Sequence, residues 1–185
     1  KIMEGSGSVM QRAACRALAI FGRDCPETRI HEEMMRRFDN QYCCAESFTR
    51  RKIYLLACEE MLKTHSSRFG RERLMLTIVT LFDDLVLDVK RKALLLIPLL
   101  WNCLKANEFN NLQKLLLERL DIEATLTNCT LISQTAESVK ATVLNFLQSG
   151  KGDMVTDRDH TQQDTLLEEQ ENYLKVYKNS DSSIS

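Results

Sequence analysis

Charged side chains near the starts of two expected helices offer the clearest chemistry in this chain. Arg50-Arg51-Lys52 and Lys90-Arg91-Lys92 are clusters of three bases, and Asp84 and Asp88 precede the second cluster. Side chains of these types form ion pairs and charge-assisted hydrogen bonds with an oppositely charged surface. We therefore expect them to bind a protein, and the candidate residues are Asp84, Asp88, Lys90, Arg91, Arg50 and Arg51.

Two other interpretations of these basic clusters remain open. Bases in a first helical turn oppose the helix dipole and need counter-charges, so the clusters can equally be solvated helix ends. A nucleic-acid contact is the weaker interpretation, because no aromatic residues alternate with the bases as a single-strand binder requires. The net charge of −1 gives no strong field that would attract nucleic acid or an anionic membrane.

The residues that could catalyse a reaction or hold a metal are not arranged for either in this sequence. It contains no glycine-rich phosphate loop, zinc-ligand spacing, HExxH motif or GxSxG motif. His31, His65 and His160 are far apart and have no supporting ligands beside them. We expect a protein without enzymatic activity that uses no cofactor, metal or small-molecule substrate.

The seven cysteines indicate a reducing compartment. They are odd in number and lie mostly in apolar helical runs, as Cys15, Cys58 and Cys103 do. Buried, reduced thiols are typical of cytosolic and nuclear proteins, and we expect a cytoplasmic one. The adjacent Cys43 and Cys44 are either a redox-sensitive pair in a turn or partly buried thiols. No apolar run is long enough to span a bilayer.

These residues must be positioned by a helix that recurs about every forty residues. Copies begin at Val9, Phe48, Val89 and Val139, so the starts are 39, 41 and 50 residues apart. Low aromatic content (6%), six glycines and two prolines favour long helices. A helical repeat of this period is typical of a HEAT-type α-solenoid, in which paired helices stack into a binding surface. We expect an all-α solenoid of three to four helix pairs over residues 1–150, the C-terminal part of a longer array.

Apolar spacing predicts the buried face of each helix. In the first helix, over 8–22, the predicted inward residues are Val9, Ala13, Ala17 and Ile20. In the third unit the inward stripe of the second helix includes Leu96, and Pro98 should kink that helix. Trp101 is more consistent with core packing than with a partner contact.

Capping and turn signals predict where the helices begin. Asp24-Cys25-Pro26-Glu27 has the form of a capping box, which should begin the helix that contains Ile30. Ser66 or Ser67 should cap the first helix of the third unit, and Asp88 should cap the second helix of that unit. A polar stretch over 121–135 predicts a long turn, which would account for the spacing of 50.

Residues 151–185 differ in composition from the rest of the chain. They hold four bases and eight acids, a net charge of −4, whereas residues 1–150 hold 21 bases and 18 acids, a net charge of +3. Few apolar residues are present, so we expect a disordered acidic tail with one short helix over 165–178.

The segment FDDLVLDVKRKALLLIPLLW, residues 82–101, resembles the HEAT consensus. Asp84 and Lys90 occupy the positions where HEAT repeats usually place an Asp and an Arg whose pairing links neighbouring repeats. The helices NLQKLLLERL and AESVKATVLNFL follow. Over residues 45–148 this order resembles the C-terminal repeats of the HEAT-repeat regulatory subunits of protein phosphatase 4, relatives of the scaffold subunit of protein phosphatase 2A.

The resemblance implies a non-catalytic regulatory or scaffold subunit that binds a Ser/Thr protein phosphatase catalytic subunit. The metals and the catalytic residues would then belong to that partner. In the family, turns within helix pairs carry partner contacts, which here implies a ridge near residues 40–47, 83–88 and 121–135. The alternative is a HEAT-repeat transport or trafficking adaptor.

Overall fold

The computed structural model describes residues 7–104, 109–125 and 127–149, which lie in the compact unit Lys1–Met154. Every regular element in these ranges is a helix, so the fold is all-α as predicted. Within the same ranges, no helix is both long enough and apolar enough to cross a membrane. The acidic tail and the short helix expected over 165–178 lie outside the described residues.

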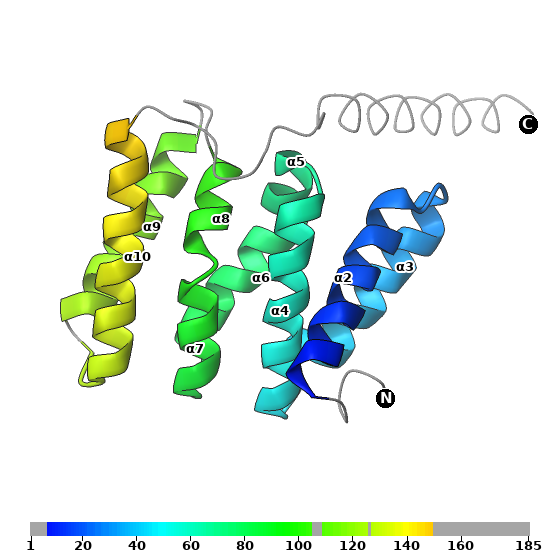
Figure 1. The fold of residues 1–185 in the computed structure, drawn as a ribbon, viewed down its shortest axis with the longest axis horizontal. Helices are drawn as coiled ribbons and strands as arrows, with labels where there is room; N and C mark the ends of the chain where they lie inside the picture. Colours follow the sequence, from blue (N-terminus) through cyan, green and yellow to red (C-terminus); the bar gives the residue numbers. More distant parts are fainter. Residues whose placement is uncertain (1–6, 105–108, 126, 150–185) are drawn as a thin grey trace, which may run out of the picture. The chain divides into compact units, whose positions relative to one another are not determined.

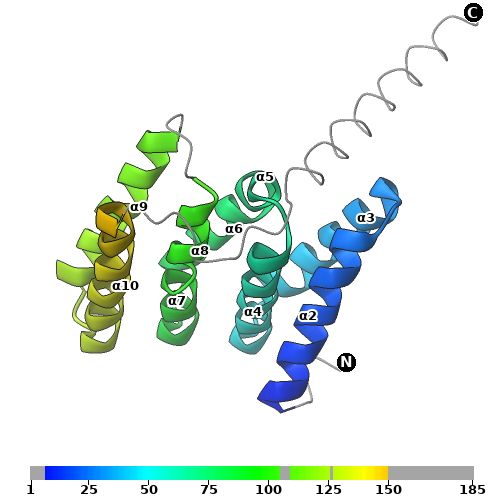
Figure 2. The ribbon, with the colours of Figure 1, turned by 45° about the horizontal axis from the view of Figure 1, so that its top comes forward.

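The helices form two layers that follow the chain order (Figures 1 and 2). One layer holds α2 (Ser8–Asp24), α4 (Phe48–Thr64), α7 (Leu87–Leu94), α8 (Ile97–Asn102) and α10 (Thr130–Ser149). The other layer holds α3 (Thr28–Phe38), α5 (Ser67–Phe69), α6 (Met75–Thr80) and α9 (Asn110–Thr125). Short π and 3₁₀ segments extend these helices at Asp39–Cys43, Gly70–Leu74 and Leu81–Asp83.

Consecutive helices make antiparallel pairs, each with one helix in either layer. The pairs are α3 with α4, α5 and α6 with α7 and α8, and α9 with α10, and α2 packs on α4 ahead of the first pair. The spaces between pairs are filled by one continuous core of buried apolar side chains. The largest fully buried ones come from α4, the α6 segment and the α7–α8 segment.

The third unit agrees with its sequence pattern. Ser66 caps α5, because its Oγ accepts a hydrogen bond from the Phe69 N–H at 3.2 Å. The chain leaves the helix between α7 and α8, and Pro98 stands in the first turn of α8, so the predicted kink is confirmed. Leu96 lies at this kink and is 1% exposed. Trp101 is also buried, as expected for a core residue.

The predicted inward face of the first helix is wrong. Val9 is 81% exposed, and Ala13, Ala17 and Ile20 are also exposed. The buried face of α2 is instead formed by the small residues Cys15, Ala19 and Gly22, which lie against α3, α4 and His65. A Cβ added to Gly22 would lie 3.3 Å from Met34 Cε and 3.5 Å from His31 Nε2. Small side chains are therefore buried here because they allow close approach, although apolar spacing favoured another face.

Two predicted helix caps are also wrong. Asp24 pairs with Arg23 at 2.7 Å, and α3 begins after Glu27 with no side-chain cap. Asp88 lies inside α7, and the Val86 N–H before that helix donates to Asp84 Oδ1 at 2.8 Å. Asp24 is therefore the last residue of α2, and Asp84 instead of Asp88 binds the backbone before α7.

The polar stretch over 121–135 is mostly helical, which corrects the predicted long turn. α9 continues to Thr125 and α10 begins at Thr130. Glu123, Ile132 and Ala136 are buried along these helices, so the stretch is held by packing and by ion pairs. The predicted helix start at Val139 is therefore also wrong, because α10 begins at Thr130 and Val139 lies inside it.

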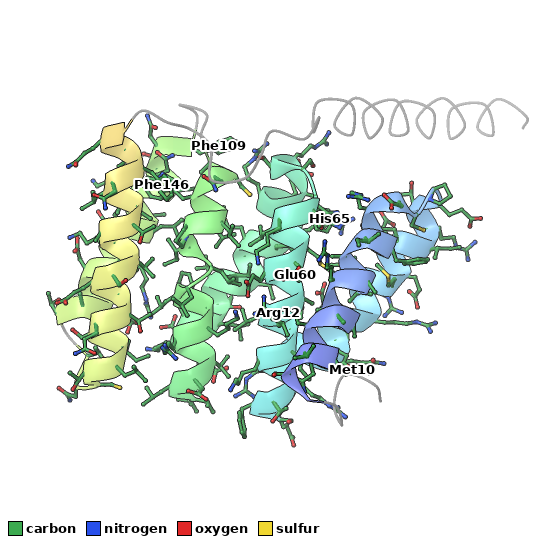
Figure 3. The ribbon with its side chains drawn as sticks, in the orientation of Figure 1. Met10, Arg12, Glu60, His65, Phe109 and Phe146 are labelled. Atoms are coloured by element: carbon green, nitrogen blue, oxygen red, sulfur yellow. The ribbon has the colours of Figure 1, made fainter. Side chains whose placement is uncertain are left out.

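Two histidines that are distant in sequence meet where α2, α3 and the α4–α5 junction come together. The rings of His31 and His65 lie 6.3 Å apart, and Phe69 stacks on His65 at 4.2 Å (Figure 3 labels His65). His65 Nε2 lies 2.9 Å from the Ala19 carbonyl oxygen, so the neutral ring donates a hydrogen bond there. Burial lowers the pKa of His65 to about 4, although the hydrogen bond to Ala19 opposes this shift. Burial also lowers the pKa of His31.

Acid should destabilise this junction before the carboxylates begin to titrate. The unfolded chain binds a proton at His65 near pH 6.5 and the folded chain only near pH 4, so the free energy of unfolding falls as the pH is lowered between these values. The expected loss is up to about 3 kcal/mol. The measurement is urea unfolding at pH 7, 6 and 5. His65→Gln keeps a hydrogen-bond donor for the Ala19 carbonyl oxygen, and the free energy of unfolding of this variant should depend less on pH. If it falls with pH as steeply as in the parent chain, His65 is not the group that causes the loss.

Leu96→Ala should reduce the free energy of unfolding by about 2–5 kcal/mol, because it leaves a cavity at the α7–α8 kink. Leu95 is the matched control, since it is 43% exposed beside Leu96 and its truncation should cost far less. Thermal or urea denaturation of both variants gives the comparison. Equal losses would show that the kink does not depend on the Leu96 side chain.

Candidate protein-binding surface

The turns that join the two helices of each pair lie along one edge of the layers, where α4, α7 and α10 begin (Figure 1). We call this edge the turn ridge; it comprises residues 44–47, 84–86 and 127–129 with the first five residues of the helices that follow. All six candidate binding residues lie on it. Their side chains differ in what they contact and in how far they reach solvent.

Arg51 and Asp84 form the most buried ion pair of the turn ridge. Arg51 Nε donates to Asp84 Oδ2 at 2.6 Å and Nη2 donates to Oδ1 at 3.0 Å. Arg51 Nη1 also donates to the carbonyl oxygens of Ala45 and Glu46, at 2.6 and 2.8 Å. The two charged side chains are 16% and 5% exposed. This pair therefore joins the turns of two successive helix pairs with fixed geometry.

The electrostatics of Asp84 agree with this geometry. Burial by itself would raise the pKa of the Asp84 carboxyl, but the hydrogen bonds from Arg51 and from the Val86 N–H outweigh it and hold that pKa below its ordinary value. The hydrogen bond to Asp84 in turn raises the pKa of Arg51. Both groups therefore remain charged over the physiological pH range.

Lys90 does not pair with Asp84, the arrangement that the HEAT-like positions suggested. Its Nζ lies 3.3 Å from Oε1 of Glu123, a residue of α9 whose side chain is 5% exposed. Arg119 joins the same cluster by donating to Glu123 at 2.8 Å and by pairing with Asp83. Lys90 therefore links the pair that contains α7 to the pair of α9 and α10. Arg51 links the pair of α3 and α4 to the pair that contains α7.

The remaining candidates are more accessible. Lys52 pairs with Asp88 at 3.1 Å, but the Asp88 side chain is still 56% exposed. Arg50 is an exposed residue in the first turn of α4, and Arg91 is the exposed fifth residue of α7. Of the six predicted residues, Asp88, Arg50 and Arg91 thus present charge to solvent on the ridge, whereas Arg51, Asp84 and Lys90 hold the ridge together.

A second set of ion pairs crosses the α2–α4–α7 layer away from the turns. Glu59 binds Lys63 at 2.7 Å and also binds Lys92 of α7, and Arg12 of α2 lies 3.4 Å from Glu60 (Figure 3). Burial would raise the pKa of Glu59, but the two lysines lower it to about 2. Lys92, the last base of the second cluster, is therefore bound within the fold.

The sequence pattern did not predict which acids pair with these bases. It placed Glu123 in a turn and gave no role to Glu59 and Glu60. One signal was available: Glu59 and Glu60 interrupt the apolar run of α4, where an unpaired carboxylate would be costly. The bases that other helices supply could not be derived, because these partners are 33 or more residues apart, whereas Lys63 lies within about one turn of Glu59 and Glu60.

Searches against protein-family models, curated proteins and solved structures find no match for this chain. In the part of the chain that the structure describes, no group of three or more His, Cys, Asp or Glu residues is placed to hold a metal ion.

Arg51→Met should destabilise the fold by about 3–5 kcal/mol, because it leaves the Asp84 carboxylate buried without its charged partner. Lys52→Met is the control from the adjacent position. It breaks an exposed pair and should cost about 1 kcal/mol or less. Urea unfolding at neutral pH compares the two, and the double variant Arg51→Met/Asp84→Leu should recover part of the loss. Equal costs for the two single variants would contradict a structural role for Arg51.

Proposed function

We propose that this chain is a HEAT-type α-solenoid that acts as a non-catalytic protein-binding scaffold. The observation that carries the proposal is the turn ridge: one edge of a two-layer helix array, held by buried ion pairs between successive helix pairs. Stacked repeats bury a continuous core and leave extended surfaces for partners. The ion pairs of Arg51, Asp84 and Lys90 restrain the backbone of the ridge. Binding a partner through the exposed side chains of the ridge therefore loses little backbone conformational entropy. These exposed residues are Asp88, Arg50 and Arg91.

The partner that we propose is the catalytic subunit of a Ser/Thr protein phosphatase. Support comes from the HEAT-like segment at residues 82–101 and from the helix order after it, which resembles the C-terminal repeats of protein phosphatase 4 regulatory subunit 4. The position of the exposed charges on the turn ridge is consistent with this, since turns carry the partner contacts in that family. On this proposal the chain acts in the cytoplasm and holds the enzyme without taking part in its chemistry.

Arg50→Glu combined with Arg91→Glu should weaken binding of the catalytic subunit about tenfold and reduce its salt dependence, because both residues offer exposed positive charge to the partner. Lys90 is left unchanged, since a carboxylate there would face Glu123 and disturb the fold. Retention of purified catalytic subunit on the immobilised chain at two salt concentrations measures the effect.

The matched control is Arg16→Glu with Arg29→Glu, an equal change of charge at exposed positions of α2 and α3 away from the ridge. It should bind like the parent chain. If the control loses binding and the ridge variant does not, the contact lies on the α2–α3 side. If the parent chain retains transport receptors or coat components but no phosphatase, the trafficking adaptor replaces the phosphatase scaffold.

A further inference from the structure

A groove of about 460 Å³ lies between α6 and α9, the helices of two successive pairs in the layer opposite α4 and α7. Its floor is formed by the buried side chains of Met75, Phe82 and Leu116. Along its walls stand leucines that the fold leaves in solvent, with Leu76 77% exposed and Leu115 58% exposed. A concave apolar surface with exposed leucines on its walls is the form that receives the apolar face of a helix.

One end of the groove is cationic. Arg71 Nη1 donates to the Cys103 carbonyl oxygen at 2.8 Å, and the guanidinium lies 4.6 Å from the centre of the Phe109 ring (Figure 3 labels Phe109). Both contacts hold the side chain in place without neutralising it. Among the described residues no carboxylate pairs with Arg71, so its charge is available to an anionic group that enters at this end.

The other end of the groove carries a carboxylate. Asp83 pairs with Arg119, but its side chain remains 70% exposed, and Arg119 is shared with Glu123. A further cation can therefore reach Asp83 from solvent. Arg71 and Asp83 are twelve positions apart on one helical segment, a separation of about 18 Å at the rise of an α-helix. The groove is thus about three helical turns long, with Arg71 at one end and, at the other, Asp83 beside Arg119, whose charge is shared with Glu123.

We propose that this groove binds an amphipathic helix of a partner protein, with an acidic first turn against Arg71 and a basic last turn against Asp83. Acidic residues are favoured in the first turn of a helix and basic residues in the last, so these charges stabilise the bound helix and match the groove in one direction only. The bound helix runs parallel to α6 and places apolar residues at i, i+4, i+7 and i+11 on the exposed leucines. This site is distinct from the proposed phosphatase contact and does not depend on it.

The test uses the purified chain and a fluorescein-labelled synthetic helix of about 14 residues, with leucines at that spacing, glutamates in the first turn and lysines in the last. Anisotropy should show saturable binding in the micromolar range. Leu115→Glu should weaken it at least about tenfold, because it puts a charge on the apolar wall. Leu147→Glu is the matched control, since Leu147 is 54% exposed on α10, and it should bind like the parent. No binding by the parent up to about 1 mM, or equal loss in both variants, overturns the proposal.

The direction of binding is tested with a second peptide that has the same leucines but lysines in the first turn and glutamates in the last. It should bind about tenfold more weakly at low salt, and the difference should shrink as salt is raised. Arg71→Gln keeps a donor for the Cys103 carbonyl and should reduce the preference between the peptides. Circular dichroism confirms that each variant is folded. Equal affinity of the parent for both peptides would overturn the assigned polarity. Because no phosphatase is present, the result is independent of the scaffold proposal.

Discussion

The structure depends on the burial of α4, which has neighbours on several sides. Ile53, Tyr54, Leu55, Ala57, Cys58 and Met61 are each no more than 2% exposed, and at helical spacing they cover more than half of the helix circumference. A helix buried over so much of its surface is not stable alone, because helical stability in proteins comes mostly from tertiary packing. It requires α2 on one side, α7 and α8 on the other, and the α3 and α6 segments behind, which makes the described pairs one cooperative unit.

This burial determines where charges can be tolerated. Glu59 and Glu60 lie on α4, and their carboxylates are stabilised by Lys63 of the same helix, by Arg12 from α2 and by Lys92 from α7. At the start of α4, Arg51 is satisfied in the same way by Asp84 of the next turn. The basic clusters, which the sequence predicts to bind a partner, are therefore largely paired with buried or partly buried acids of the same chain. What remains for a partner is a smaller set on the turn ridge, held in fixed positions by the paired residues.

The two surfaces discussed as binding sites have different physical origins. The turn ridge is a polar edge that is rigid because ion pairs connect successive helix pairs. The groove between α6 and α9 exists because these two helices carry leucines that neither buries against the other, while α9 packs on α10. The groove ends at Asp83, next to the turn that holds Asp84. A partner helix in the groove and a partner on the ridge would therefore lie close to each other around this turn.

The sequence by itself determined the local parts of this protein. Its forty-residue helical period predicted the all-helical fold, and the stripe containing Leu96 was buried as expected. Ser66 capped the start of α5 and Pro98 interrupted a helix, both as predicted. These features depend on residues a few positions apart, where spacing and propensity decide. Tertiary structure alone decided the rest. The buried face of α2 was set by how closely Cys15, Ala19 and Gly22 let α3 and α4 approach, and the partners of Arg51 and Lys90 were acids brought near by packing. Such choices depend on contacts between separate helices, because the energy of a buried charge or a close helix contact is fixed by what lies opposite it in space.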